Sequence, residues 1–174
     1  MMIKLEKIVL EDYEFLQNMA RFYVYDMSKY CGSLSGWSLP KNGLYECFDL
    51  KCYITHEDRY AYFVTVKGER AGFVMVNKIA SSVDVDWTIG EFFILGQFQG
   101  RGVGQKAVSL VFKELPGVWE VGVMPENTGA FSFWSTVLKK LADQREIQSG
   151  YTAVPTEILE PEPHIMNNFK IETL

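Results

Sequence analysis

Residues 91–104 read Glu-Phe-Phe-Ile-Leu-Gly-Gln-Phe-Gln-Gly-Arg-Gly-Val-Gly, and the fold of the chain is decided by this stretch. Its first part, Glu91–Leu95, is mostly apolar, as is typical of a strand inside a sheet. Its second part is a glycine-rich turn, and the apolar side chains from Ala107 to Leu115 that follow recur at helical spacing. The stretch therefore predicts a strand, a tight turn and a helix from about Val103 to Leu115.

The glycine-rich turn is the first candidate site. Glycines permit positive φ and a close approach of the backbone, and the first N–H groups of the following helix point toward the turn. Together with the helix dipole they predict a phosphate or pyrophosphate site. Gln105 stands where a Walker loop starting at Gly100 needs its second glycine and where GxGxxG needs its third, so both nucleotide motifs are excluded. A tight turn without a ligand stays open as the alternative.

Before this stretch, the sequence predicts a short strand over Ile3–Ile8, then a helix that Asp12 caps and that runs to about Lys29. Residues 31–42 read as a loop, and 43–56 as a short helix followed by a loop. Two runs rich in β-formers, 60–66 and 71–76, predict a hairpin. The run 83–95 predicts a third strand with a bulge at Gly90. On it, Asp84 and Asp86 face outward as solubilising groups, with binding of a cationic acceptor as the alternative.

After the central helix, residues 118–123 predict a strand and Thr128 to about Ala142 a helix. Further strands are expected near Glu146–Val154 and His164–Glu172. No linker or repeat interrupts the chain, so we expect one α/β domain over residues 1–174 with a mixed sheet.

Composition narrows the functional classes. The chain has 174 residues with a formal net charge of −5, which disfavours general nucleic-acid binding. Its three cysteines form no CxxC pair and its two histidines lie far apart, so we expect no structural metal. No run reaches about 18 apolar residues and the N-terminus has no signal-peptide core, so we expect no membrane span and a cytoplasmic location.

Two motifs resemble those of the GNAT family of acyl-CoA-dependent N-acetyltransferases. Its signature, Gln/Arg-x-x-Gly-x-Gly/Ala after the fourth strand, is matched by Gln99, Gly102 and Gly104. A second motif, Asn-x-x-Ala-x-x-Phe-Tyr, is matched from Asn127 to Phe133, with Trp134 in place of the tyrosine. The resemblance covers roughly residues 89–138. It implies an α/β (α+β) fold with a central mixed, mostly antiparallel, twisted sheet that is flanked by helices and splayed between strands four and five.

The resemblance also implies acetyl-CoA as the co-substrate. In this family the backbone N–H groups of the glycine loop bind the pyrophosphate, the fourth strand pairs with the pantetheine arm, and the second motif lines the other wall. Carried over, the cofactor-binding residues are Phe93, Ile94, Leu95, Gln99, Gly100, Arg101, Gly102, Val103, Gly104, Lys106 and Asn127. Ordinary solvated charge is the alternative for Arg101 and Lys106, and a helix N-cap is the second role open to Asn127.

Acetyl transfer to an amine requires proton movements. An amine with a pKa near 10.4 is nucleophilic in only about one molecule in 10³ at neutral pH, so a base is needed. Glu91 is the candidate, because partial burial on its strand would raise its pKa into the useful range. A solvent-facing carboxylate is the alternative. The family's tyrosine proton donor is missing at Trp134, because an indole N–H is no acid. Either Tyr151 or a water molecule takes its role, or the thiolate, with a pKa of about 8.5 for a simple thiol, leaves without assistance.

The first helix is where the family closes over the acceptor. Tyr25, Asp26 and Tyr30 are therefore candidates for binding an amine through charge and cation–π contacts, with an ordinary core stripe as the alternative. We expect direct acetyl transfer, in a ternary complex, to a small-molecule or peptide amine, with a homodimer as the default assembly. The alternative function is a non-catalytic acyl-CoA-binding regulatory module.

Overall fold

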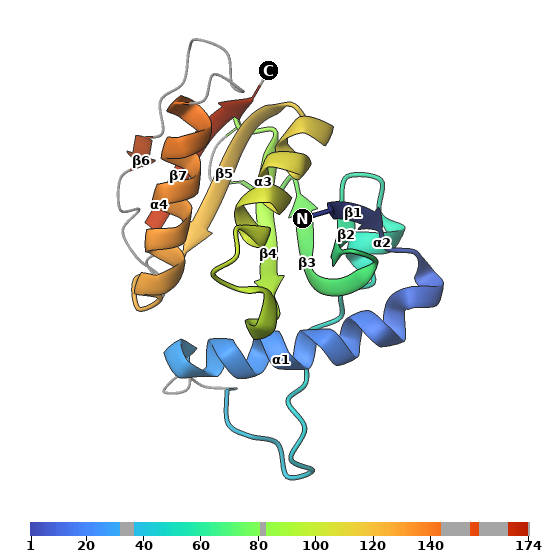
Figure 1. Ribbon diagram of the computed structural model, residues 1–174. Helices are drawn as coiled ribbons and strands as arrows, with labels where there is room; N and C mark the ends of the chain where they lie inside the picture. Colours follow the sequence, from blue (N-terminus) through green and yellow to red (C-terminus); the bar gives the residue numbers. More distant parts are fainter. Residues whose placement is uncertain (32–36, 81–82, 144–153, 157–166, 174) are drawn as a thin grey trace.

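The computed structural model describes residues 1–31, 37–80, 83–143, 154–156 and 167–173. Its elements, in chain order, are β1 (Ile3–Lys7), η1 (Leu10–Asp12), α1 (Tyr13–Cys31), α2 (Cys52–Thr55), β2 (Tyr60–Val66), β3 (Glu69–Asn77), β4 (Trp87–Ile94), η2 (Gly96–Phe98), α3 (Val103–Glu114), β5 (Gly117–Val123), α4 (Thr128–Asp143), β6 (Val154–Thr156) and β7 (Asn167–Thr173) (Figure 1). Within these residues no helix is both long and apolar enough to cross a membrane.

The strands form a mixed, mostly antiparallel sheet in the order β1-β2-β3-β4-β5-β7-β6. Only β4 and β5 are parallel among the strand pairs described, and their ladder runs from Trp87–Trp119 to Ile89–Val121. Past this point the two strands diverge toward their carboxyl ends (Figure 1). The expected sheet with a splay between the fourth and fifth strands is therefore confirmed.

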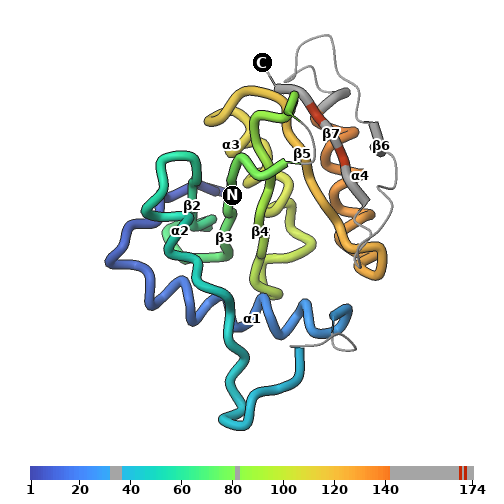
Figure 2. The backbone as a smooth tube through the Cα atoms, turned by 180° about the vertical axis from the view of Figure 1, so that it is seen from behind, coloured from blue at the N-terminus to red at the C-terminus, as the bar shows by residue number. Residues whose placement is uncertain are grey.

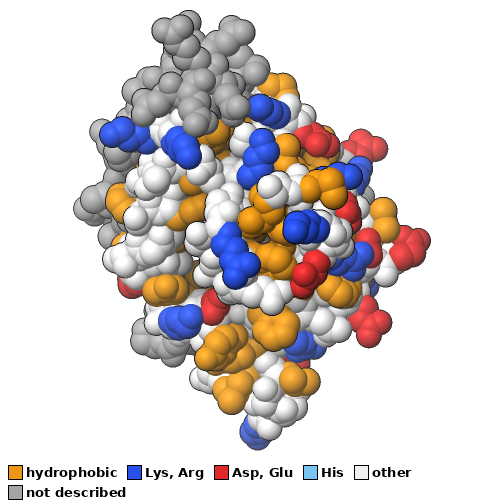
Figure 3. Space-filling model, in the orientation of Figure 1, with side chains coloured by type: hydrophobic (Ala, Val, Ile, Leu, Met, Phe, Trp, Pro, Cys, Tyr) orange, Lys and Arg blue, Asp and Glu red, His pale blue; other side chains and the backbone are white. Residues whose placement is uncertain are grey.

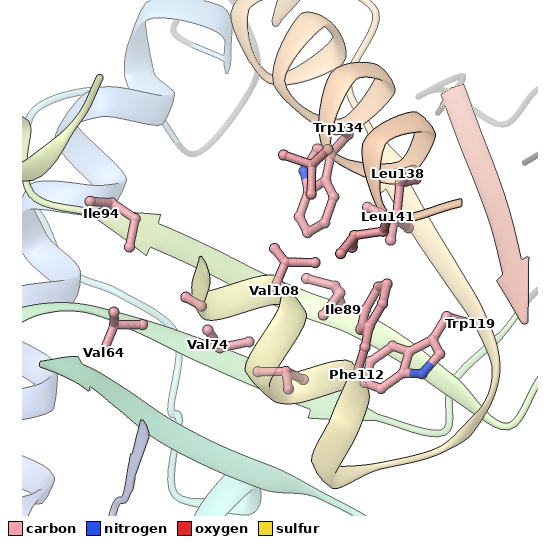
Figure 4. Packing of buried hydrophobic residues seen from close by; sticks show 14 of the residues in the cluster. Val64, Val74, Ile89, Ile94, Val108, Phe112, Trp119, Trp134, Leu138 and Leu141 are labelled. Atoms are coloured by element: carbon pink, nitrogen blue, oxygen red, sulfur yellow. The ribbon is translucent and has the colours of Figure 1, made fainter. Parts of the chain in front are cut away.

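Helices cover both faces of the sheet. One core lies between the sheet and the pair α3 and α4, where Val74 and Ile89 of the sheet meet Val108 of α3 and Leu138 of α4 (Figure 4). A second core lies on the opposite face, where Leu16, Met19 and Ala20 of α1 pack with sheet residues such as Phe73 and Phe93. The alternation of side chains along each strand supplies both cores. In both backbone views α1 crosses one end of the sheet (Figures 1 and 2).

A β-bulge at Gly90 confirms the expectation from sequence. Met75 of β3 pairs with Glu91 and Val76 with Ile89, so Gly90 is the additional residue of β4. A Cβ at this position would lie 2.3 Å from the Tyr53 hydroxyl, so only glycine fits. The extra residue interrupts the alternation of faces. Ile89 therefore packs in the core beneath α3 and α4, whereas Glu91 turns toward α1.

Some expected boundaries are wrong. The strand predicted over 83–95 begins at Trp87, so Asp84 and Asp86 precede it. Both are exposed, as expected, and the Asp86 carboxylate also accepts a hydrogen bond of 2.8 Å from the backbone N–H of Val118 at the start of β5. In the segment 43–56 the order is the reverse of the expected one, since the loop comes first and the short helix α2 follows it. The buried side chain of Tyr53 packs against Gly90 in the bulge and holds α2 in this position. Asp12, the expected cap of the first helix, is the last residue of η1 and forms an ion pair of 2.5 Å with Arg70.

The remaining elements lie close to their expected bounds. The hairpin of β2 and β3, the strand β5 and the helices α1, α3 and α4 are all confirmed to within a few residues. Of the two C-terminal strands, β7 is confirmed at Asn167–Thr173. Residues 146–153, most of the other expected strand, lie outside the described part of the chain.

Candidate active site

A cleft of about 330 Å³ occupies the splay between β4 and β5. Its walls come from five places: the bulged part of β4, the end of β5 with the residues after it, one stripe of α1, the loop residue Trp37 and the first turns of α4. The lining residues are Tyr23, Met27, Cys31, Trp37, Ile89, Gly90, Glu91, Phe92, Val121, Gly122, Val123, Met124, Asn127, Ala130 and Trp134. The cleft exists because the parallel ladder ends at Ile89–Val121 and leaves the two strands to separate.

Glu91 is the central ionisable group of this cleft. It is half-buried, and its Oε2 accepts a hydrogen bond of 2.5 Å from the hydroxyl of Tyr23 on α1. Burial raises the pKa of Glu91 to about 7, although the Tyr23 hydrogen bond acts in the opposite direction. Near neutral pH the carboxyl group is therefore divided between its two protonation states, as a proton acceptor requires.

The groups around Glu91 stay neutral at this pH. Burial, and then the negative charge of Glu91, raise the pKa of Tyr23 well above its ordinary value. The same two causes raise the pKa of the Cys47 thiol to about 11. Burial also raises the pKa of Tyr53, whose hydroxyl accepts a hydrogen bond from the side-chain amide of Asn77. Glu91 is thus the side chain of this group whose charge changes near neutral pH.

The glycine loop precedes α3 and has the backbone geometry of an anion cradle. Gly100 and Gly102 have φ values of +69° and +76°, and Gly102 is the N-cap residue of α3. The N–H of Lys106 donates to the Gly102 carbonyl at 3.0 Å, so the N–H groups of the preceding residues lie in the unpaired first turn of the helix. A Cβ on Gly100 or Gly102 would meet nothing within 4 Å, which shows open space beside the loop.

These features fit a diphosphate. Backbone donors, the positive end of a 12-residue helix and free space are combined at one place. Arg101 and Lys106 are exposed beside the loop. In the view of Figure 3, Lys and Arg side chains gather over α3 and α4, whereas acidic side chains lie mostly along the right-hand edge. The side-chain amide of Gln99 donates to the Ile94 carbonyl at 2.7 Å and ties the loop to the end of β4.

Of the β4 residues expected to bind the cofactor, Phe93 packs in the core beneath α1 and Ile94 in the core beneath α3 and α4. Their side chains are therefore structural, and only their backbone groups are available for strand-like pairing. Residues 90–92, slightly earlier in β4, line the cleft.

The second motif forms the opposite wall. The side chain of Asn127 accepts a hydrogen bond of 2.9 Å from the Ala130 N–H, so it caps α4 and also lines the cleft. Trp134 is buried and packs edge-on against Phe92, with 5.3 Å between ring centroids. The expectation that Trp134 belongs to the core or the wall is confirmed. Gly104 lies against this wall, because its Cβ would be 3.1 Å from the Phe133 ring.

The structure does not bring the expected acceptor residues to the cleft. Tyr25 is 58% exposed, Asp26 pairs with Lys29 at 2.9 Å, and Tyr30 is absent from the lining. Tyr25 is also no core residue, contrary to the alternative reading. Tyr151, the expected proton donor, lies outside the described residues.

The stripe of α1 that does line the cleft is Tyr23, Met27 and Cys31. The sequence analysis missed Tyr23 as a site residue. Its signal was the spacing of these three residues at i, i+4 and i+8, which places them on one face of a helix.

Comparison with known proteins agrees with this fold. The model of the acetyltransferase (GNAT) family matches residues 34–137, and the chain belongs to this family. No curated protein sequence matches the chain. Members of the family use acetyl-CoA as their co-substrate.

Solved structures show the same fold. An acetyltransferase from Thermus thermophilus is 18% identical over 98% of this chain and 96% of its own, with a TM-score of 0.62. A mutant of the spermidine N-acetyltransferase SpeG from Vibrio cholerae is 14% identical over 98% and 93%, with a TM-score of 0.56. The PaiA N-acetyltransferase from Thermoplasma acidophilum, in complex with coenzyme A, is 16% identical over 99% of both chains, with a TM-score of 0.54.

Proposed function

We propose that this chain is an N-acetyltransferase that moves the acetyl group of acetyl-CoA directly to an amine within a ternary complex. The observation that carries the proposal is the placement of Glu91. This carboxyl group titrates near neutral pH, lies in the splay of the sheet, and is followed 13 residues later by Gly104, the end of the glycine loop. A proton acceptor and an anion cradle thus belong to one continuous strand–turn–helix unit.

The cofactor would be held mainly by backbone groups. The N–H groups of residues 100–104 would bind the diphosphate, with Arg101 and Lys106 as charge partners. The free edge of β4 beyond Ile89 would pair with the amide-bearing arm, and Asn127 would line the opposite side. When bound, the cofactor supplies an activated thioester.

Glu91 would accept a proton from the amine, directly or through one water molecule. An ammonium group with a pKa near 10.4 must lose this proton before its nitrogen can attack a carbonyl carbon. The Tyr23 hydroxyl fixes the Glu91 carboxylate by donating to Oε2, and it stays protonated while doing so. The proton that the leaving thiolate needs cannot come from Trp134, so Tyr151 or water stays our prediction for its source.

The second candidate is a non-catalytic acyl-CoA-binding module. It is favoured by Trp134, which occupies the position of the family's tyrosine and fills the wall with an indole ring. Such a module would bind the cofactor and acetylate no amine.

Calorimetry with acetyl-CoA and a thiol-release assay over a broad amine panel separate the two candidates. We expect binding and turnover. Glu91→Gln should lower kcat by about 10²–10⁴, the usual contribution of a general base, with cofactor affinity largely unchanged. Glu11→Gln, an exposed carboxylate before α1, is the matched control. Binding without product from any amine would favour the module, and absence of binding would remove both candidates.

A further inference from the structure

The cleft can be approached from the two faces of the splayed sheet, and we assign one face to the cofactor and the other to the acceptor. The glycine loop begins α3, and α3 packs with α4 on one face. On the other face lies α1, toward which Glu91 turns. If the cofactor is held at the α3 side, as the proposed function requires, the amine reaches Glu91 from the α1 side. The inference below rests on that proposed function.

The α1 side of the cleft is lined by sulfur-containing and aromatic side chains. Met27 and Cys31 follow Tyr23 at one-turn intervals, and Trp37 and Met124 complete the surface around Glu91. The Cys31 Sγ lies 3.4 Å from the Met124 Sδ, so α1 and the segment after β5 are in contact here. We call these six residues the acceptor compartment. Thioether and thiol groups pack well against aromatic rings and aliphatic chains.

The compartment offers one negative charge. Among the described residues that line the cleft, Glu91 is the single acidic side chain. Two further carboxylates lie outside the lining: Asp26, on the same helix, pairs with Lys29, and the exposed Glu126 acts on Cys31 only through its charge. One ammonium group beside Glu91 is compensated, whereas a second would be buried without a counter-charge. A carboxylate on the acceptor would be repelled by Glu91.

We propose that the acceptor is a small amine with a single positive charge on an apolar body, such as an arylalkylamine. Polyamines are disfavoured because the described lining holds no second carboxylate, and free amino acids are disfavoured by the charge of Glu91. The compartment selects an aromatic or aliphatic body through Met27, Trp37 and Met124.

The test compares 2-phenylethylamine, spermidine and free lysine at saturating acetyl-CoA, with calorimetry of each amine on the coenzyme A complex. We expect kcat/KM for 2-phenylethylamine to exceed that for spermidine by about tenfold or more. Turnover that prefers spermidine or lysine would overturn this inference and leave the proposed function standing. No binding and no product with any of the three amines would overturn this inference, and the proposed function would fall as well only if the broad amine panel also gave no product.

Met27→Glu sharpens the test by adding a second carboxylate one turn from Tyr23. We expect the ratio of kcat/KM for 2-phenylethylamine to that for spermidine to fall by about tenfold, because the second ammonium gains a partner. Asn18→Glu, which adds the same charge at an exposed position of α1, is the control and should leave the ratio unchanged. An unchanged ratio in a Met27→Glu protein with wild-type melting would overturn the inference; if the variant does not fold, the wild-type panel decides.

Discussion

At the scale of single residues, the site depends on two opposing influences on one carboxyl group. Burial of Glu91 in the cleft raises its pKa to about 7, and the Tyr23 hydroxyl limits that rise by stabilising the carboxylate. The sequence predicted the first influence from a glutamate inside an apolar run. It did not predict the second, because Tyr23 and Glu91 are 68 residues apart.

Removal of the Tyr23 hydroxyl should move the pH profile. Activity needs the carboxylate form of Glu91, so kcat/KM rises with pH through the pKa of that group. Tyr23→Phe deletes a hydrogen bond to the charged form, and the acidic limb should move to higher pH by about one pH unit. Measurement of kcat/KM between about pH 5.5 and 9 checks this.

Tyr62→Phe is the matched control. It also removes a tyrosine–glutamate hydrogen bond, of 3.4 Å to Glu114, at a place remote from the cleft. Its profile should coincide with that of the wild type. If Tyr23→Phe lowered activity equally at every pH, the hydroxyl would not act through the ionisation of Glu91.

At the scale of elements, the bulge in β4 determines where the carboxylate points. In a regular strand, Ile89 and Glu91 would lie on the same face. The extra residue at Gly90 separates them, so that Ile89 joins the core beneath α3 and α4 and Glu91 meets α1. The glycine is required by close packing, because Tyr53 and Asn77 would lie 2.3 and 2.7 Å from its Cβ.

Gly90→Ala should therefore disturb both stability and activity. The methyl group would displace the Tyr53–Asn77 hydrogen bond, and overpacking together with this loss should cost about 2–4 kcal/mol. Urea unfolding at neutral pH measures the free energy. We also expect lower kcat at temperatures where the variant stays folded, because the Glu91 carboxylate would point in a different direction.

Gly96→Ala provides the comparison for this variant. Gly96 lies in η2, and its Cβ would meet nothing within 4 Å. The free energy of unfolding should change by less than about 1 kcal/mol. Equal effects of the two substitutions would show that the contacts at Gly90 are not the reason for its glycine.

At the scale of the whole molecule, ionisation of Glu91 is expected to raise activity and to lower the stability of the fold. Its folded-state pKa, about 7, lies above the ordinary value of 4.5. The stability contributed by the protonated group is thus fully present below pH 4.5 and is lost as pH rises through about 7. Activity, which needs the carboxylate, rises over the same range.

Glu91→Gln should accordingly be more stable than the wild type at high pH. We expect the difference in free energy of unfolding to grow between about pH 5.5 and pH 8 and to reach about 1–3 kcal/mol at the upper value. Urea unfolding at both pH values checks it, with Glu11→Gln as the control. A difference that stays constant with pH would show that burial does not perturb this carboxyl group.

The sequence alone determined the strand–turn–helix unit from β4 to α3, the bulge at Gly90 and the capping role of Asn127. Each of these depends on residues close together in the chain: glycines that permit positive φ, apolar side chains at helical spacing, and an N-cap that bonds three residues ahead. Local interactions of this kind are encoded within about fifteen residues and are visible in one sequence.

Only the tertiary structure decided which stripe of α1 lines the cleft. Tyr25, Asp26 and Tyr30 were the expected acceptor residues, whereas Tyr23 and Met27 lie in the lining. Several stripes of α1 carry aromatic side chains, and the choice among them depends on how the helix packs against β3 and β4. That packing joins residues far apart in the chain, and a pattern within one helix contains no information about its rotation on a distant sheet.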